Sequence, residues 1–186
     1  MKAIVINAAV FQIGWLLCVL SGANQVPLLG TLAALLIVTW HVTHQARPRD
    51  ELLLILYAGG IGAVWDSLLV YTGLLQYPSG TLIEGTAPYW IIAMWLLFAT
   101  TLNVSLKWLR HRPYLAAILG LVAGPAAYYA GYKLGGVQIP DFVSAMAALA
   151  AGWALLMPLL IHLSVRLDTA SHQAPGALAQ GVDARV

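Results

Sequence analysis

Six long apolar stretches, separated by short polar links, constrain this chain of 186 residues more than any other feature. They cover residues 3–22, 26–44, 52–75, 88–107, 114–134 and 142–165. A helix needs about 20 largely apolar residues to cross the hydrocarbon core of a bilayer, and each stretch is close to that length. We therefore expect an all-α polytopic membrane protein. Residues 1–168 would form one bundle of six transmembrane helices, and residues 169–186 a disordered cytoplasmic tail.

The composition excludes an ordinary water-soluble domain. Hydrophobic residues make up 61% of the chain and charged residues only 9%, whereas soluble domains carry about 25% charged residues. The net charge of +2 is too small to indicate nucleic-acid binding, so the expected surroundings are the lipid bilayer. Cys18 is the only cysteine, which excludes an intrachain disulfide and a thiolate metal cluster. The sequence also lacks a nucleotide-binding loop, a nucleophile elbow and a zinc-protease motif.

The basic residues indicate an orientation. If the six spans are correct, all basic residues except Lys133 fall on one side of the membrane. Cytoplasmic loops carry an excess of lysine and arginine, so this side is expected to be cytoplasmic and to hold both termini. The residues on this side are Lys2, Arg47, Arg49, Lys107, Arg110, Arg112, Arg166 and Arg185.

The first apolar stretch also has a second interpretation. The small residues Ser21-Gly22-Ala23 would suit cleavage after a signal peptide. Against cleavage, Lys2 is the only basic residue before the stretch, and the polar Asn7 and Gln12 interrupt it. A retained helix is therefore expected.

Asp66 is the only acidic residue inside an expected span. A carboxylate in the middle of a bilayer costs about 2.5–3.5 kcal/mol on insertion scales, so Asp66 should face protein or a water-filled cavity. Gly59 and Gly62 share its helix face, and small residues allow helices to approach closely. Two roles stay open: a protonatable group in a binding or transport cavity, and a structural acid that fixes the helix register.

Several residues could accompany Asp66 in a polar cavity. Tyrosines in the outer half of the fifth span lie at a similar depth, and a phenol can donate a hydrogen bond to a carboxylate. The first and fourth spans contribute further polar groups. The expected substrate-binding cavity comprises Asp66, Tyr128, Tyr132, Gln12 and Asn103.

Three histidines are weaker candidates for metal or haem ligands. His41 and His44 are three residues apart and so share a helix face, and His162 is in the inner half of the last span. Membrane di-iron desaturases and hydroxylases collect many more histidines than the five in this chain. Histidines that meet lipid headgroups are the simpler explanation. We therefore predict no metal site and no catalytic residue, and the sequence indicates no particular cofactor.

Four groups of residues, in order along the chain, carry a resemblance to a known family. They are Phe11–Val19, Trp65–Leu69, Pro88–Trp90 with Phe98–Leu109, and Gly124–Gly131. Together they resemble a family of short bacterial inner-membrane proteins catalogued only as a domain of unknown function, number 2878. The resemblance implies a bacterial inner-membrane location. Members of that family are often encoded beside enzymes that modify membrane fatty acids, which implies a lipid-related role and such enzymes as possible partners.

The expected function is therefore non-enzymatic. A small membrane protein of this kind would bind or transport a lipidic or apolar substrate, or assist its modification, with Asp66 as the buried polar anchor. Two alternatives stay open. One is a lipid-modifying or electron-transfer enzyme subunit with histidine ligands, and the other is a non-catalytic scaffold for a lipid-modifying enzyme.

Overall fold

A computed structural model describes residues 1–173 of the chain, with side chains placed through residue 168. The described part is all-α, as expected. Its helices are α1 (Lys2–Ala23), α2 (Pro27–Thr43), α3 (Pro48–Tyr71), α4 (Tyr89–Ala99), the short 3-10 helix η1 (Lys107–Leu109), α5 (Pro113–Lys133) and α6 (Phe142–Gln173).

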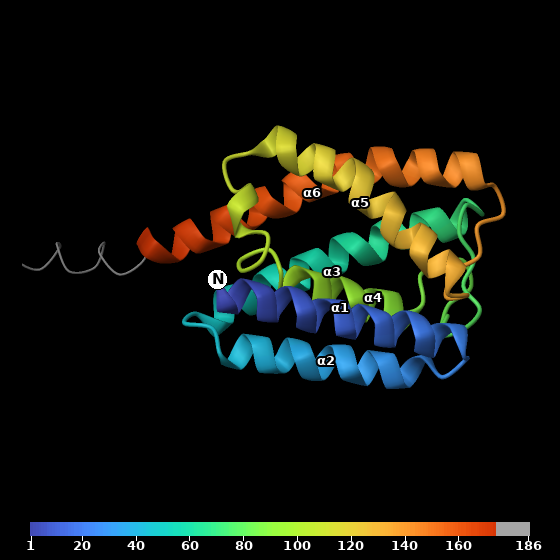
Figure 1. Cartoon of the computed structure of the whole chain (residues 1–186), viewed down its shortest axis with the longest axis horizontal. Coiled ribbons are helices and arrows are strands. Elements are labelled where there is room, and N and C mark those ends of the chain that lie inside the picture. The colour runs from blue at the N-terminus through green and yellow to red at the C-terminus, as the bar shows by residue number, and fades with distance from the viewer. Residues whose placement is uncertain (174–186) are drawn as a thin grey trace, which may run out of the picture.

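Consecutive helices run antiparallel, and their links gather at two opposite ends of the molecule (Figure 1). One end holds the start of α1, the α2–α3 link and the segment between α4 and α5. The other end holds the remaining three links. Helices α1, α3, α5 and α6 are long and apolar enough to cross a membrane, whereas α2 and α4 have only 17 and 11 residues. The chain is thus a membrane protein by the length and composition of these four helices.

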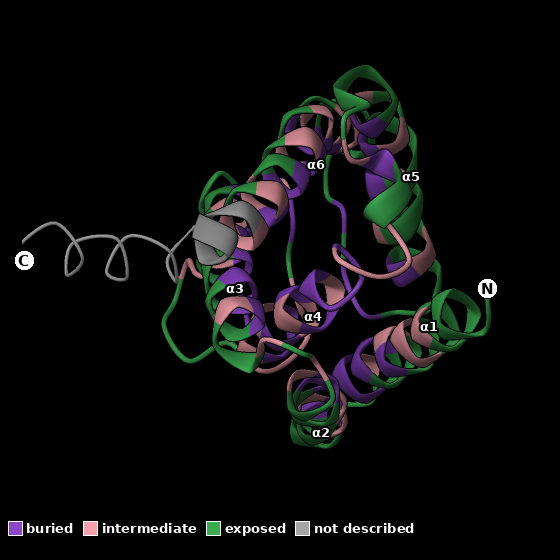
Figure 2. Ribbon diagram, turned by 90° about the vertical axis from the view of Figure 1, so that its left-hand side faces the viewer, coloured by how far each residue is buried: buried purple, intermediate pink, exposed green. Residues whose placement is uncertain are grey.

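The short helix α4 lies at the centre of the bundle, and the other helices surround it (Figure 2). Trp90, Trp95 and Leu97 on this helix are buried, and α4 packs against α1, α2 and α3. The expected span over residues 88–107 is wrong in its second half, because α4 ends at Ala99. Turns then lead to η1. At 1.5 Å per residue, a helix of 11 residues is only about 16 Å long.

A side chain from α1 compensates for the early end of α4. Asn7 donates from Nδ2 to the carbonyl oxygen of Thr100 at 3.1 Å. Its Oδ1 accepts the hydroxyl of Ser105 at 2.7 Å and the backbone N–H of Ser105 at 3.3 Å. Non-helical backbone at membrane depth is tolerated where protein groups satisfy it. Asn7 thus satisfies two backbone groups of the non-helical segment after α4, while local turns supply most of its other backbone hydrogen bonds.

Glycines allow the closest helix contacts, in agreement with the expected small-residue packing. A Cβ added at Gly62 of α3 would overlap the ring of Trp95 on α4. Additions at Gly120 and Gly124 of α5 would overlap the backbone or ring of Trp153 on α6. These glycines bring the two tryptophans deep into the bundle.

The end of α6 differs from the sequence expectation. The helix continues to Gln173, so it extends five residues past residue 168, where the expected transmembrane domain ended. The rest of the predicted tail, residues 174–186, lies outside the described residues.

Candidate functional site

Asp66 is completely buried and receives three hydrogen bonds. Its Oδ1 accepts the hydroxyl of Tyr128 at 2.7 Å and the hydroxyl of Tyr77 at 3.0 Å. Its Oδ2 accepts the indole N–H of Trp95 at 2.6 Å. The donors come from α5, from the α3–α4 link and from α4. The expected contact with Tyr128 is present, and Asp66 joins three separate parts of the fold.

The segment that carries Tyr77 is folded against the bundle. It turns at Gly73, which has a positive φ of 74°, and the backbone of Gln76 pairs with that of Gln138. Further along, the indole of Trp90 donates to the carbonyl of Ser79 at 3.0 Å. Burial, and after it the charge of the Asp66 carboxylate, raises the pKa of Tyr77 well above its usual value. Tyr77 therefore keeps its proton and stays a donor to Asp66.

The charge of Asp66 has no opposite charge beside it. Its three donors are neutral, and no ion pair to Asp66 is present among the described side chains. An indole N–H can only donate, so at least one carboxylate oxygen must be an acceptor. The site thus presents a buried carboxylate that neutral donors hold in place.

A cavity of about 380 Å³ lies directly beyond these donors. It is bounded by α1 on one side and α5 on the other, with α4 and α6 behind. Tyr77, Trp95 and Tyr128 line it, whereas Asp66 stands behind them. Pockets for small molecules usually measure about 300–1,000 Å³, so this cavity has the size of a ligand site.

The cavity wall is largely aromatic. The rings of Trp95 and Trp153 stack with centroids 4.9 Å apart, and Phe98 meets Trp153 edge to face at 5.4 Å. None of the described residues that line the cavity is charged, and Gln12 supplies the one side-chain amide among them. This wall favours an apolar occupant.

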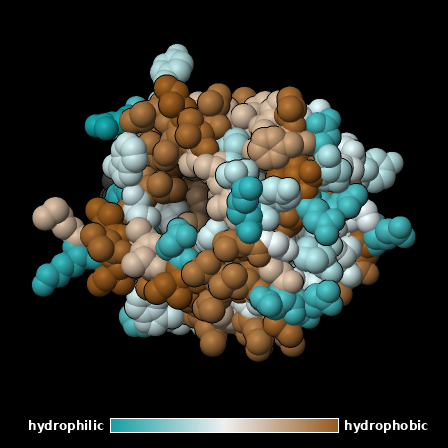
Figure 3. Space-filling view, turned by 45° about the vertical axis from the view of Figure 1, so that its right-hand side comes forward, coloured by the Kyte–Doolittle hydropathy of each residue, from teal (hydrophilic) through white to brown (hydrophobic). Residues whose placement is uncertain are grey.

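The cavity opens sideways, between α1 and α5. These two helices are described over their full lengths and make few or no direct contacts with each other. Gln12 of α1 and Ala123 and Ala127 of α5 line the cavity and are also exposed at the molecular surface. The space-filling view shows a hollow bordered by hydrophobic side chains (Figure 3). An apolar molecule could therefore reach the cavity from the hydrophobic surface of the bundle.

Three of the predicted cavity residues, Gln12, Tyr132 and Asn103, are not among the hydrogen-bond donors to Asp66. Gln12 lines the cavity but makes no hydrogen bond to the carboxylate. Tyr132 is 40% exposed, and the ammonium of Lys133 lies 5.7 Å from its ring. The structure does not bring Tyr132 to the cavity wall: it lies one helical turn beyond Tyr128, at the end of α5.

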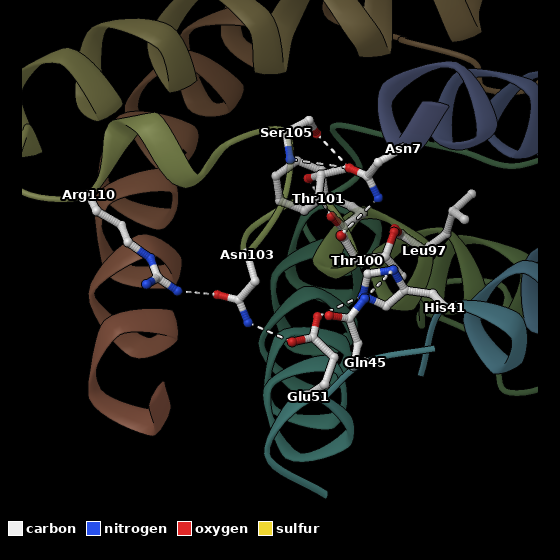
Figure 4. A network of polar contacts seen from close by, with 11 residues as sticks. Asn7, His41, Gln45, Glu51, Leu97, Thr100, Thr101, Asn103, Ser105 and Arg110 are labelled. Atoms are coloured by element: carbon white, nitrogen blue, oxygen red, sulfur yellow. Dashed lines mark hydrogen bonds and ion pairs between the residues drawn. The ribbon is translucent and has the colours of Figure 1, made fainter. Parts of the chain in front are cut away.

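Asn103 belongs to a second polar network near the other end of the bundle (Figure 4). Its Nδ2 donates to Glu51 at 2.6 Å, and its Oδ1 accepts from Arg110 at 2.6 Å. His41 contacts the other carboxylate oxygen of Glu51 at 2.8 Å, and Arg110 also pairs with Asp168 at 2.8 Å. The prediction that Asn103 shares a cavity with Asp66 is therefore wrong. Glu51 is a second buried acid, because α3 begins four residues before the expected span.

The three histidines considered as ligands are engaged separately. His41 faces Glu51, His44 donates from Nδ1 to the carbonyl of Trp40 at 2.8 Å, and His162 accepts from Arg166 at 3.2 Å. Across residues 1–168 there is no group of three or more His, Cys, Asp or Glu side chains that could hold a metal ion.

Tyr77, Trp95 and Trp153 are not among the residues predicted for this site, although the depth of the two tryptophans also suits the lining of an apolar ligand site. The two tryptophans lie deep within apolar runs, where packing is the usual role. Tyr77 lies in a link, and its sequence gives no sign that the link folds inward. The one usable signal was Gly62, which is a helical turn before Asp66 and leaves room on the same face for a large ring.

Comparisons with known proteins identify a family and no function. No curated protein and no solved structure matches the chain. A family model described as "Protein of unknown function (DUF2878)" matches residues 4–159, which include every wall of the cavity and all four residues of the Asp66 cluster. The chain therefore belongs to the DUF2878 family.

Proposed function

We propose that this protein binds an apolar molecule from the bilayer in the cavity between α1 and α5. The observation that carries the proposal is the cavity itself, which measures about 380 Å³, has aromatic and uncharged walls and opens between α1 and α5. Such binding would serve transport of the molecule or its presentation to a partner enzyme. A fatty-acid-modifying enzyme is the partner that the family resemblance favours.

In this proposal Asp66 is a positioning residue. It does not line the cavity, but it holds Tyr77, Trp95 and Tyr128, three wall residues from three different elements. A cluster that fixes its own members in this way keeps a binding site preformed, which lowers the entropic penalty of ligand binding. In this proposal Asp66 fixes the helix register, and by doing so it also supports binding in the cavity.

The proposal includes a topology of six membrane-embedded helices in a bacterial inner membrane, with both termini in the cytoplasm. The support is the distribution of basic residues. Lys2, Arg47, Arg49 and Arg110 all belong to the end of the bundle where α1 begins, whereas Lys133 belongs to the opposite end. Helix α4 is enclosed by the others and does not need the length of a lipid-exposed span.

A filled cavity provides the direct test. Ala127 and Ala126 are neighbours on α5 and both are exposed, but only Ala127 lines the cavity. We expect Ala127→Phe to abolish saturable binding of 1-bromo-4-tert-butylbenzene, followed by quenching of tryptophan fluorescence by bromine in nanodiscs. Ala126→Phe should bind as the wild type does. Equal binding by wild type and Ala127→Phe would rule out this cavity as the site.

A further inference from the structure

We infer that the molecule bound in this cavity is an apolar cation, with an amine or quaternary ammonium group at the end nearest Asp66. The inference rests on the proposed function and names the chemical class of its ligand. Three features of the wall support it: the uncompensated carboxylate, the aromatic faces in front of it, and the direction of the hydrogen bonds.

The first feature is electrostatic. Asp66 is completely buried, its donors are all neutral, and none of the described residues that line the cavity is charged. Charges interact far more strongly in a protein interior than in water. A cation in the cavity would provide the opposite charge that the Asp66 cluster lacks, whereas an anion would be repelled. The site therefore selects by the sign of the charge.

The second feature is aromatic. The indoles of Trp95 and Trp153 stack on each other, and Phe98 packs edge to face against both. Cations are attracted to aromatic faces, most strongly to tryptophan and in desolvated sites. Trp95 also donates its N–H to Asp66, which enriches the electron density of its ring. The walls can thus accept an ammonium group without a charged residue at the cavity surface.

The third feature is the orientation of the phenols. Tyr77 and Tyr128 both donate their hydroxyl protons to Asp66, so each oxygen has only acceptor capacity left for the cavity. A phenol oxygen that can only accept a hydrogen bond suits the N–H of an amine. It is electrostatically unfavourable next to a carboxylate, sulfonate or phosphate, which are acceptors themselves. Fatty-acid and phosphate head groups are therefore poor occupants of this end of the cavity.

Three bromophenyl probes of matched shape test the inference in nanodiscs of phosphatidylcholine. They are 4-bromophenyltrimethylammonium, its neutral isostere 1-bromo-4-tert-butylbenzene, and the anion 4-bromobenzenesulfonate. Binding is followed by quenching of tryptophan fluorescence and corrected for partitioning into empty nanodiscs. We expect the cation to bind about tenfold more tightly than the neutral probe, in the range of a desolvated cation–π contact, and the anion to show no saturable binding.

Charge removal gives the matched comparison. Asp66→Asn should bring the affinities for the cation and the neutral probe to within about twofold of each other. Glu51→Gln removes the other buried acid, outside the cavity, and should keep the preference. If Asp66→Asn cannot be purified folded, the wild-type preference over the neutral probe, together with its persistence in Glu51→Gln, decides the question.

The outcomes separate the two proposals. Saturable binding of the neutral probe that Ala127→Phe removes, with no preference for the cation, would overturn the inference and leave the proposed function intact. A cation preference that survives in folded Asp66→Asn would also overturn it. Absence of saturable binding by any probe would overturn both.

Discussion

At the scale of single residues, the Asp66 cluster shows how a buried carboxylate is accommodated without a cation. Each donor is an aromatic residue that is apolar on one side and carries one N–H or O–H group at its edge. Such residues satisfy the carboxylate and still present a hydrophobic face to the cavity. The Asp66 cluster therefore acts as one unit, formed by Asp66, Tyr77, Trp95 and Tyr128. Loss of any donor should change the strength of the hydrogen bonds that the other donors make to Asp66.

Trp95→Phe tests this unit. The substitution removes the only donor to Oδ2 of Asp66 among the described residues and keeps a ring in place. An unsatisfied buried acceptor costs about 1–3 kcal/mol, so we expect the unfolding free energy in detergent to fall by that amount. Trp40→Phe is the control, because Trp40 is 49% exposed and its ring packs against His44, away from the Asp66 cluster. A loss no greater than that of the control would contradict the role given to Trp95.

Part of this site could be predicted from the sequence. A charged residue within an apolar run indicates a protein partner, and Tyr128 has the right depth and chemistry to be that partner. Tyr132, one helical turn further along α5, satisfied the same criteria but lies at the end of the helix, outside the cavity wall and 40% exposed. The sequence does not indicate at which turn of α5 the cavity ends. Tyr77 could not be found, because its position depends on the backbone pairing of Gln76 with Gln138.

At the scale of elements, the contact between α3 and α4 depends on a glycine, which has no side chain. Gly62 leaves the space that the Trp95 ring occupies, which is how that ring reaches Asp66. Gly60, two residues earlier on α3, has no atom within 4 Å of the place where a Cβ would be. The two glycines form a natural pair for comparison.

We expect Gly62→Ala to destabilise the protein by about 1–3 kcal/mol through overpacking. It should also shift the emission of Trp95 as its hydrogen bond to Asp66 is lost. Gly60→Ala should show neither change. The measurement is detergent unfolding, with near-ultraviolet circular dichroism to report on the tryptophans. Equal stability of the two variants would mean that Trp95 can move without loss of the contact.

The end of α4 is the element that sequence reasoning described least well. Residues 100–107 are more polar than α4, with Thr100, Thr101, Asn103, Ser105 and Lys107, but the prediction counted them within a span of ordinary length. Asn7, which hydrogen-bonds to this segment, is 93 residues away from Thr100 in the sequence. A pattern confined to one segment cannot include such a partner. The bounds of α1, α2 and α5 were predicted more closely, and the start of α5 follows a local feature, Pro113.

Asn7→Leu should therefore loosen the segment after α4 in particular. The substitution leaves the carbonyl of Thr100 and the N–H of Ser105 without their partner, and protein data put such losses at about 1–3 kcal/mol. We expect faster amide hydrogen exchange at residues 100–106. Asn24→Leu is the control, since Asn24 is exposed and bonds only within its own helix. Unchanged exchange in this segment would show that other groups can replace Asn7.

At the scale of the whole molecule, the two ends of the bundle differ in chemistry. The aromatic cavity and the Asp66 cluster lie toward the end with the α3–α4 and α5–α6 links, and the Glu51 network lies toward the other. The orientation predicted from the basic residues would place the Glu51 network near the cytoplasm. The predicted orientation depends only on the positions of the basic residues and on the number of membrane-spanning segments. Both can be read from the sequence.

Cysteine labelling checks the orientation. Cys18 is buried and should not react in the folded protein, and Cys18→Ala gives a clean background. In that background, E84C at the end with the α3–α4 link should react with a membrane-impermeant maleimide in intact spheroplasts. R49C at the opposite end should react only after the membrane is opened. The reverse pattern would invert the topology.

The hydrogen bonds from Asn7 also bear on the biogenesis of the protein. Because α1 leaves the ribosome first, its amide is in place before the segment at residues 100–106 has to leave water. If a protease removed α1, the end of α4 would lose these partners and the cavity would lose one wall. The first helix therefore has to stay in the chain for the segment after α4 to keep these hydrogen bonds and for the cavity to stay enclosed on the side of α1.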